Sequence, residues 1–244
     1  LDSGLPHAIQ VFKELREQGI KPKRYGIRMD SGDLAYLSKK VKAALDAEGF
    51  TDAIISASND LDEGLIGSLK AQGATINSWG VGTNLITSKD CPAFGGVYKL
   101  AAIWNETERQ FVPKIKISEN AEKITNPGDK KIYRIYDLEG MIVADLIALA
   151  DEEFSSEDPL LLFDPIETWK KTLLPGGSYT MRELLIPVFR NGECVYESPT
   201  VMEIQKRCRE ELNTLWEESK RFEYPHQTYV DLSRKLWNLK NNLL

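Results

Sequence analysis

The sequence is poor in the side chains that most often hold metals or act as nucleophiles. It contains two histidines, His7 and His226, and three widely spaced cysteines with no CxxC pair among them. A zinc site and a Ser-His-Asp or Cys-His catalytic set are therefore not expected. Scattered cysteines are also typical of a reducing compartment, so we predict a cytoplasmic protein.

Broad positive charge and long apolar runs are missing as well. The 31 Lys and Arg residues are outnumbered by 37 Asp and Glu residues, which gives a formal net charge of -6. Such a chain offers no general basic surface to a nucleic acid, although local cations and backbone amides can still bind a small anion. No stretch reaches the roughly 18 consecutive apolar residues of a membrane span. We predict neither nucleic acid nor membrane as a partner.

The composition does support a sizeable fold. The chain has 244 residues, of which 42% are hydrophobic and 28% charged, enough for one large domain or a domain with a smaller appendage. It begins with Leu1 rather than Met, and residues 1–7 resemble the beginning of a helix inside a domain. We therefore expect this chain to be a piece of a longer protein.

The first 100 residues alternate between helical and strand patterns. Apolar residues at helical spacing, each run closed by a glycine, predict helices at 5–19, from about 34 to 48, and at 61–73. Short apolar runs between them predict strands at 25–29, 52–57, 75–79 and 95–100. Strands joined by crossover helices pair in parallel, so the loops that follow them open on one edge of the sheet.

Residues 101–198 instead have the alternation of antiparallel strands. Strands are predicted at 111–117, in a hairpin of 131–137 with 141–149, and in a hairpin of 184–189 with 194–197. Helices follow from Thr200 to about Phe222 and from Leu232 onward. We predict three parts: βα units at 1–100, a β-rich region at 101–198, and C-terminal helices at 199–244 that pack on the body.

The loops after the first three strands carry side chains suited to a phosphorylated sugar. Glycines in residues 80–83 allow backbone amides to approach an anion, and Thr83 adds a hydroxyl. Asp30 and Asp60 can accept hydrogen bonds from sugar hydroxyls or hold Mg²⁺ through water. The alternatives remain that the glycine loop is an ordinary tight turn and that Asp30 or Ser31 only caps a helix.

Cations near this edge are open to more than one interpretation. Arg28 can bind a carboxylate or a pyrophosphate, or stack on an aromatic ring, but it can also simply pair with Asp30 or Asp60. Lys99 and Lys116 can supplement an anion site or be ordinary surface lysines.

Five short motifs, in this order, resemble nicotinate phosphoribosyltransferases. They are GIRMDSGDL at 26–34, SND at 58–60, WGVGTNL at 79–85, GVYKL at 96–100 and KIS at 116–118. The likeness covers nearly the whole chain, including the tail YPHQTYVDLS at 224–233. Members of this family are about twice as long, so the resemblance implies the C-terminal half.

The resemblance implies a fold and a reaction. The fold is α/β, part of a type II phosphoribosyltransferase barrel-like domain with an appended, mostly antiparallel β region and C-terminal helices, in a homodimer. The reaction joins nicotinate to 5-phosphoribosyl 1-pyrophosphate, releasing pyrophosphate, with Mg²⁺ present and ATP hydrolysis coupled, in NAD salvage.

The resemblance also implies roles for single residues. Asp30 and Asp60 would be catalytic and face the ribose, Arg28 would face the pyridine ring or pyrophosphate, and Gly80, Gly82 and Thr83 would hold the 5′-phosphate. Further substrate-binding candidates in the same motifs are Ser31, Asp33, Asn59 and Lys99.

The chain departs from the family's pattern in two respects. The family's phosphorylatable histidine lies in the upstream half and has no match here, so we expect this piece alone to lack ATP-coupled activity. Ala121 stands where proline is expected. Because no single residue identifies the nicotinate carboxylate, the alternatives are a nicotinamide or quinolinate phosphoribosyltransferase, or a non-catalytic phosphate-binding or association fragment.

Overall fold

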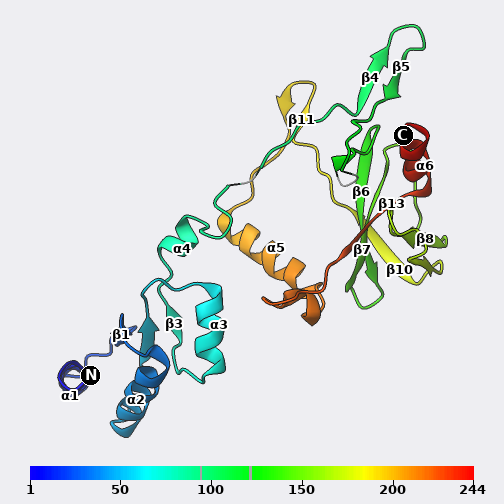
Figure 1. The fold of residues 1–244 in the computed structure, drawn as a ribbon. Coiled ribbons are helices and arrows are strands. Elements are labelled where there is room, and N and C mark those ends of the chain that lie inside the picture. The colour runs from blue at the N-terminus through cyan, green and yellow to red at the C-terminus, as the bar shows by residue number, and fades with distance from the viewer. Residues whose placement is uncertain (94, 121–122) are drawn as a thin grey trace. The chain divides into compact units, whose positions relative to one another are not determined.

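The computed structural model describes residues 1–93, 95–120 and 123–244, which divide into two compact units (Figure 1). Unit 1 is Leu1–Gly96 and unit 2 is Val97–Leu244, and each has its own hydrophobic core. The three-part division predicted at residues 100 and 198 stays a prediction. Ala121 lies outside the described residues.

Unit 1 is built on a parallel sheet of β1 (Gly26–Met29), β2 (Ile54–Ala57) and β3 (Ser78–Trp79), in that order. The parallel pairing predicted from the strand and helix spacing is confirmed. Within the described residues the sheet is open and no closed barrel forms. The three strands therefore end at one common edge, where the candidate site loops begin.

The third strand is shorter than the predicted 75–79 because Asn77 pairs through its side chain. Its Oδ1 accepts from the Ile55 amide at 2.9 Å, and its own amide donates to the Ile55 carbonyl at 3.0 Å. The side-chain oxygen of Asn77 thus accepts the hydrogen bond that a backbone carbonyl accepts in a regular strand pair. Only Ser78 and Trp79 then pair regularly with β2.

Three helices of unit 1 match the predicted positions to within two residues at each end: α1 (Gly4–Glu17), α2 (Leu34–Ala47) and α3 (Glu63–Ala71). The short α4 (Thr83–Ile86) begins in the predicted glycine loop and is not among the predicted helices. Gly49 and Gly73 follow α2 and α3 with φ of +78° and +74°, a conformation that favours glycine and ends the helix. No helix in residues 1–93, 95–120 or 123–244 is both long and apolar enough to cross a bilayer.

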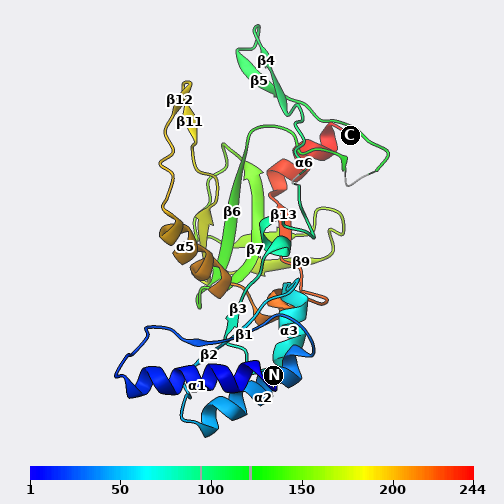
Figure 2. The same cartoon turned by 90° about the vertical axis from the view of Figure 1, so that its left-hand side faces the viewer.

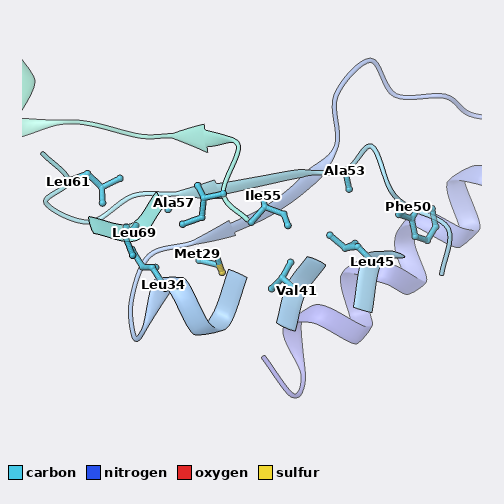
Figure 3. Close-up of a cluster of buried hydrophobic side chains, with 12 residues drawn as sticks. Met29, Leu34, Val41, Leu45, Phe50, Ala53, Ile55, Ala57, Leu61 and Leu69 are labelled. Carbon is cyan, nitrogen blue, oxygen red and sulfur yellow. The ribbon is translucent and has the colours of Figure 1, made fainter. Parts of the chain in front are cut away.

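The core of unit 1 lies between the sheet and α2 (Figure 3). Val41 and Leu45 of α2 are fully buried and lie against Ile55 of β2. Each such aliphatic side chain contributes about 1.5–3 kcal/mol by leaving water. The ring of Phe12 joins α1 to this core through an edge contact with Phe50, with ring centroids 5.6 Å apart.

Unit 2 is organised by a sheet in the order β10 (Tyr179–Glu183), β6 (Lys130–Asp137), β7 (Ile142–Leu149), β13 (Tyr229–Leu232). The predicted β6–β7 hairpin is confirmed, and every second residue of β7 is buried. These side chains pack on β8 (Leu160–Phe163), which pairs with β9 (Lys171–Leu174).

Two short hairpins form in unit 2, one where only a strand is predicted and one that is shorter than its prediction. The first is β4 (Ala102–Asn105) with β5 (Gln110–Pro113), so the strand predicted at 111–117 ends at Pro113. The second is β11 (Phe189–Arg190) with β12 (Glu193–Cys194). The Asn191-Gly192 turn of the second has φ of +49° and +83°, the positive values that a two-residue hairpin needs.

The predicted strand at residues 95–100 is wrong, because no strand forms there. All six residues are exposed, and nothing lies within 4 Å of a Cβ added at Gly95 or Gly96. An isolated extended segment leaves its backbone groups unpaired, so an apolar pattern alone does not make it a strand.

Helix α5 (Val201–Asn213) begins at the predicted cap, Thr200, which forms a capping box. Glu211, on its last turn, ties it to the sheet. The Glu211 carboxylate lies 2.7 Å from Arg182 Nη2 on β10 and 3.6 Å from Arg134 Nη1 on β6.

The same helix ends earlier than the predicted Phe222. The Thr214 carbonyl accepts from the Ile142 amide at 2.9 Å, and the Trp216 indole donates to the Ile142 carbonyl at 2.8 Å. These two bonds hold Thr214 and Trp216 against Ile142, the first residue of β7, and so prevent the helix from continuing. Only the 3₁₀ helix η2 (Glu217–Lys220) follows.

The sequence patterns missed β13, and Leu232, predicted as the start of a helix, is its last residue. This strand pairs in parallel with β7, so its conformation depends on a distant partner. Ser233 then caps α6 (Arg234–Asn242), which lies against β7 (Figure 2). Leu236 of α6 is fully buried.

Replacing Gly26 by alanine should destabilise unit 1. A Cβ at this position would lie 2.0 Å from the Ile54 carbonyl oxygen, and backbone on both sides prevents relief. We expect the free energy of unfolding to fall by about 2–3 kcal/mol, measured by hydrogen exchange of the β2 amides. Gly4→Ala, where nothing lies within 4 Å, is the control. Equal protection in both variants would contradict the close approach.

Asp231 should make unit 2 less stable as pH rises. It is 6% exposed on β13, and burial together with the nearby Asp164 raises its pKa from 3.8 to about 6. Between these values the folded state holds a proton that the unfolded state has lost, so stability falls through this window. Asp231→Asn should raise the free energy of unfolding by about 1–2 kcal/mol near pH 7.5 and change it little near pH 4.

Urea unfolding of Asp231→Asn at the two pH values measures this difference. Glu183→Gln, an exposed acid on β10, is the matched control. A stabilisation of Asp231→Asn that is the same at both pH values would show that titration is not its cause.

Candidate functional site

The ends of β1, β2 and β3 bring the predicted site loops together at one edge of unit 1. Ser58, after β2, donates from Oγ to Asp30 Oδ1, after β1, at 2.5 Å. The Gly80 amide, after β3, donates to the Ala57 carbonyl at 2.7 Å. The three loops therefore touch in sequence across the edge, as their spacing predicts.

Asp30 is oriented by two donors. Its Oδ1 accepts from Arg28 Nη2 at 2.7 Å as well as from Ser58. Of the two pairings open for Arg28, the structure has the one with Asp30. Both side chains are more than half exposed, so this ion pair contributes at most about 1 kcal/mol and either group remains free to turn to a ligand.

The helix caps are residues other than those considered from the sequence. Asp33 caps α2 by accepting from the Tyr36 amide at 2.9 Å, so the alternative in which Asp30 or Ser31 is the cap is wrong. Asp62 caps α3 in the same way. An aspartate bound to an N3 amide is the usual start of a helix. Asp33 thus caps a helix, whereas Asp30 and Ser31 are exposed at the edge and do not cap α2.

The turn after β2 holds two consecutive residues in the left-handed region. Asn59 has φ of +97° and Asp60 of +46°. Asn and Asp tolerate this region better than other residues with side chains. The Asn84 side chain donates to the carbonyls of Asp60 and Leu61, each at 3.0 Å, and so holds the turn. The Asp60 carboxylate is exposed and makes no hydrogen bond within the described part of the chain.

Asn84 is a site residue that sequence reasoning did not single out. It lies in the WGVGTNL motif at 79–85, but its partners are backbone carbonyls in the loop after the neighbouring strand, more than 20 residues back in the chain. Nothing in the local sequence reveals such a bond. The one sequence feature that could have indicated the role of Asn84 is its position directly after a loop that is expected to lie beside Asp60.

The residues of the glycine loop at 80–83 have two different roles. Gly80 uses its own amide in the sheet, and a Cβ there would lie 3.3 Å from Ser58 Cβ, so it serves close packing of two loops. The amides of Val81, Gly82 and Thr83 make no hydrogen bond within residues 1–93, 95–120 and 123–244. Gly82 has open space around its Cα. These three amides, rather than that of Gly80, are available to an anion.

The two candidate lysines lie outside unit 1. Lys99 is an exposed residue of unit 2, in the 95–100 segment where the predicted strand is missing. Lys116 is also exposed in unit 2, and its amide donates to Thr125 Oγ1 at 2.9 Å. Their part in an anion site stays a prediction.

The donors at this edge fit a hard cation only in part. In the described residues no group of three or more His, Cys, Asp or Glu side chains is placed to hold a metal ion. Asp30 and Asp60 offer exposed carboxylate oxygens, the ligand type that Mg²⁺ prefers. Mg²⁺ commonly binds through one or two carboxylates together with water and substrate phosphates, and this arrangement suits that mode.

Comparison with known proteins gives a consistent result. The model of the nicotinate phosphoribosyltransferase C-terminal domain matches residues 129–240. The chain is 46% identical over 241 residues to the nicotinate phosphoribosyltransferase of Bacillus subtilis, covering 98% of this chain and 48% of that protein. It is 34% identical over 251 residues to the Caenorhabditis elegans protein of the same name, covering 99% and 43%.

Solved structures agree with these relatives. The crystal structure of human nicotinic acid phosphoribosyltransferase matches with a TM-score of 0.66 and 25% identity, over 90% of this chain and 40% of that one. A nicotinate-nucleotide pyrophosphorylase from Pyrococcus furiosus shares the fold, with a TM-score of 0.51 and 19% identity.

The chain spans about half the length of the curated relatives that it matches. The resemblance seen in the five short motifs is thus confirmed: this chain is similar over nearly its whole length to nicotinate phosphoribosyltransferases, and residues 129–240 match the model of that family's C-terminal domain.

Proposed function

We propose that this chain provides the C-terminal half of a nicotinate phosphoribosyltransferase subunit acting in NAD salvage. The observation that carries the proposal is the shared edge of the sheet, where the adjacent loops that carry Asp30, Asp60 and the amides of residues 81–83 contact one another. Carboxylates beside an anion-binding turn suit the ribose and the 5′-phosphate of one substrate. The 46% identity to the Bacillus subtilis enzyme supports nicotinate as the base.

In this proposal each candidate residue has a defined task. The Val81, Gly82 and Thr83 amides, with the Thr83 hydroxyl, bind the 5′-phosphate, and Gly80 keeps the loop against Ser58. Asp30 and Asp60 bind the ribose, with Ser31 and Asn59 beside them. Arg28 leaves Asp30 to face the pyrophosphate or the pyridine ring, while Asp33 acts by holding α2 in place. Lys99 is a further anion ligand.

The reaction breaks the bond between the anomeric carbon and pyrophosphate and forms one to the nicotinate ring nitrogen. Positive charge develops at the anomeric carbon as pyrophosphate leaves. The carboxyl groups of Asp30 and Asp60 beside the ribose stabilise that charge, because fixed dipoles and charges act strongly where they need no reorganisation. Mg²⁺ supplies the complementary stabilisation of the leaving pyrophosphate. Coupling to ATP would depend on a histidine of the upstream half.

The remaining parts of the assembly are proposed from the resemblance. The upstream half would add the missing strands of a type II barrel-like domain to the open β1–β2–β3 sheet. Two such subunits would form a homodimer in the cytoplasm. A nicotinamide or quinolinate phosphoribosyltransferase remains the alternative enzyme, and a non-catalytic phosphate-binding fragment the alternative of another class.

Removing the charge of Asp60 should slow the reaction without unfolding unit 1. In the full-length protein, Asp60→Asn should lower kcat by on the order of 10²-fold. Asparagine is the suitable replacement because residue 60 has positive φ, which alanine adopts poorly. Glu106→Ala, an exposed acid in the β4–β5 turn, is the control. Wild-type kcat in Asp60→Asn would remove this residue from the site.

Calorimetry should separate the enzyme from the non-catalytic fragment. This chain alone, titrated with nicotinate mononucleotide, should bind weakly through the phosphate and ribose, and Asp30→Asn should weaken that binding. The full-length protein should turn over nicotinate faster than nicotinamide or quinolinate. Binding by the chain together with no turnover of any base by the full-length protein would favour the non-catalytic fragment.

A further inference from the structure

Unit 2 contains a pocket that has no part in the proposed transferase site. It has a volume of about 290 Å³ and lies between the β7–β13 pair and the β8–β9 hairpin. Val143, Ala144 and Leu162 form an apolar part of its lining. Asp231 and Asp164 bring two carboxylates to the same space.

Asp231 is an unusual member of this lining. It is 94% buried on β13, and its carboxylate makes no hydrogen bond or ion pair within the described residues. A buried carboxylate normally has a partner, because the charge loses its water on burial. Burial raises its pKa to about 6, which is the signature of an uncompensated charge.

Asp164 is the second carboxylate, and it is already held in place. It follows β8, and its Oδ1 accepts from the amides of Ile166 and Glu167 at 2.8 and 2.7 Å. These two amides lower its pKa, so it stays ionised at neutral pH. A fixed negative charge therefore lies beside Asp231 and disfavours its ionisation.

The nearby cations do not neutralise Asp231. The Lys170 ammonium pairs with the Glu167 carboxylate. Lys171 lines the pocket but is exposed and makes no ion pair in residues 1–93, 95–120 and 123–244. The Tyr229 ring completes the polar side of the lining. The lining thus contains two acidic and two basic side chains, but neither lysine forms an ion pair with Asp231 in the described residues.

We propose that this pocket binds a small organic monocation, an alkylammonium or alkylguanidinium group. Its charged head would lie between Asp231 and Asp164, and its carbon chain would lie on Val143, Ala144 and Leu162. A metal ion fits less well, because Mg²⁺ and Ca²⁺ need about six oxygen ligands and no third acidic ligand is among the described residues here. The apolar lining favours a cation that carries carbon.

Titration of the folded chain with n-butylammonium, followed by NMR chemical shifts of unit 2 amides, tests the proposal. We expect saturable binding with Kd on the order of millimolar, as for other ligands of this size. Asp231→Asn, which folds because it removes a buried charge, should weaken binding by about tenfold or more. Glu183→Gln is the control with an exposed acid on the same sheet.

Two further arms complete the test. Butan-1-ol, which has the chain without the charge, should bind at least about tenfold more weakly. N-acetyl-lysine methylamide distinguishes the source of the cation: binding of this probe supports a lysine side chain, and its failure beside bound butylammonium supports a free amine. Binding of butan-1-ol as tight as butylammonium, unchanged binding in Asp231→Asn, or no saturable binding would each overturn the proposal. Asp60→Asn, in unit 1, should leave amine binding unchanged.

Discussion

The parallel pairing of β1 with β2 is the constraint on which the candidate site depends. Its register sets Met29 opposite Ala57, so the next residues of both strands emerge at the same level and Ser58 reaches Asp30. Gly26 permits the pairing at the other end, where the two backbones come too close for any side chain. The loops after the two strands therefore lie side by side because backbone hydrogen bonds align the strands, and the core around Val41 only holds the layers together.

The site joins rigid parts to loosely held ones. Gly80 and Asn84 fix the loops through backbone bonds, whereas Arg28 and Asp30 form an exposed ion pair that costs little to open. Such a division suits a substrate that carries several negative charges: the loop amides keep a fixed shape for one phosphate, and the arginine can move to another. The left-handed backbone conformation of Asn59 places local strain at this same edge of the sheet.

In unit 2, several partly buried charges are held by hydrogen bonds or ion pairs. Arg134 binds Asp145 through two hydrogen bonds, and Glu211 adds α5 to this network. Asp231 is the exception, since it is as buried as the core around it and has no partner within the described residues. This unpartnered carboxylate at a pocket is the basis of the proposed cation site.

Sequence periodicity alone determined the βα order of unit 1, the β6–β7 hairpin and the cap at Thr200, because each follows from neighbours in the chain. The family resemblance also came from short motifs that carry their own chemistry. The structure also shows that Asp33, rather than Asp30 or Ser31, caps α2. Tertiary structure decided that β13 exists and that residues 95–100 form no strand. Both outcomes depend on whether a backbone group finds a partner far along the chain, which local propensity does not determine.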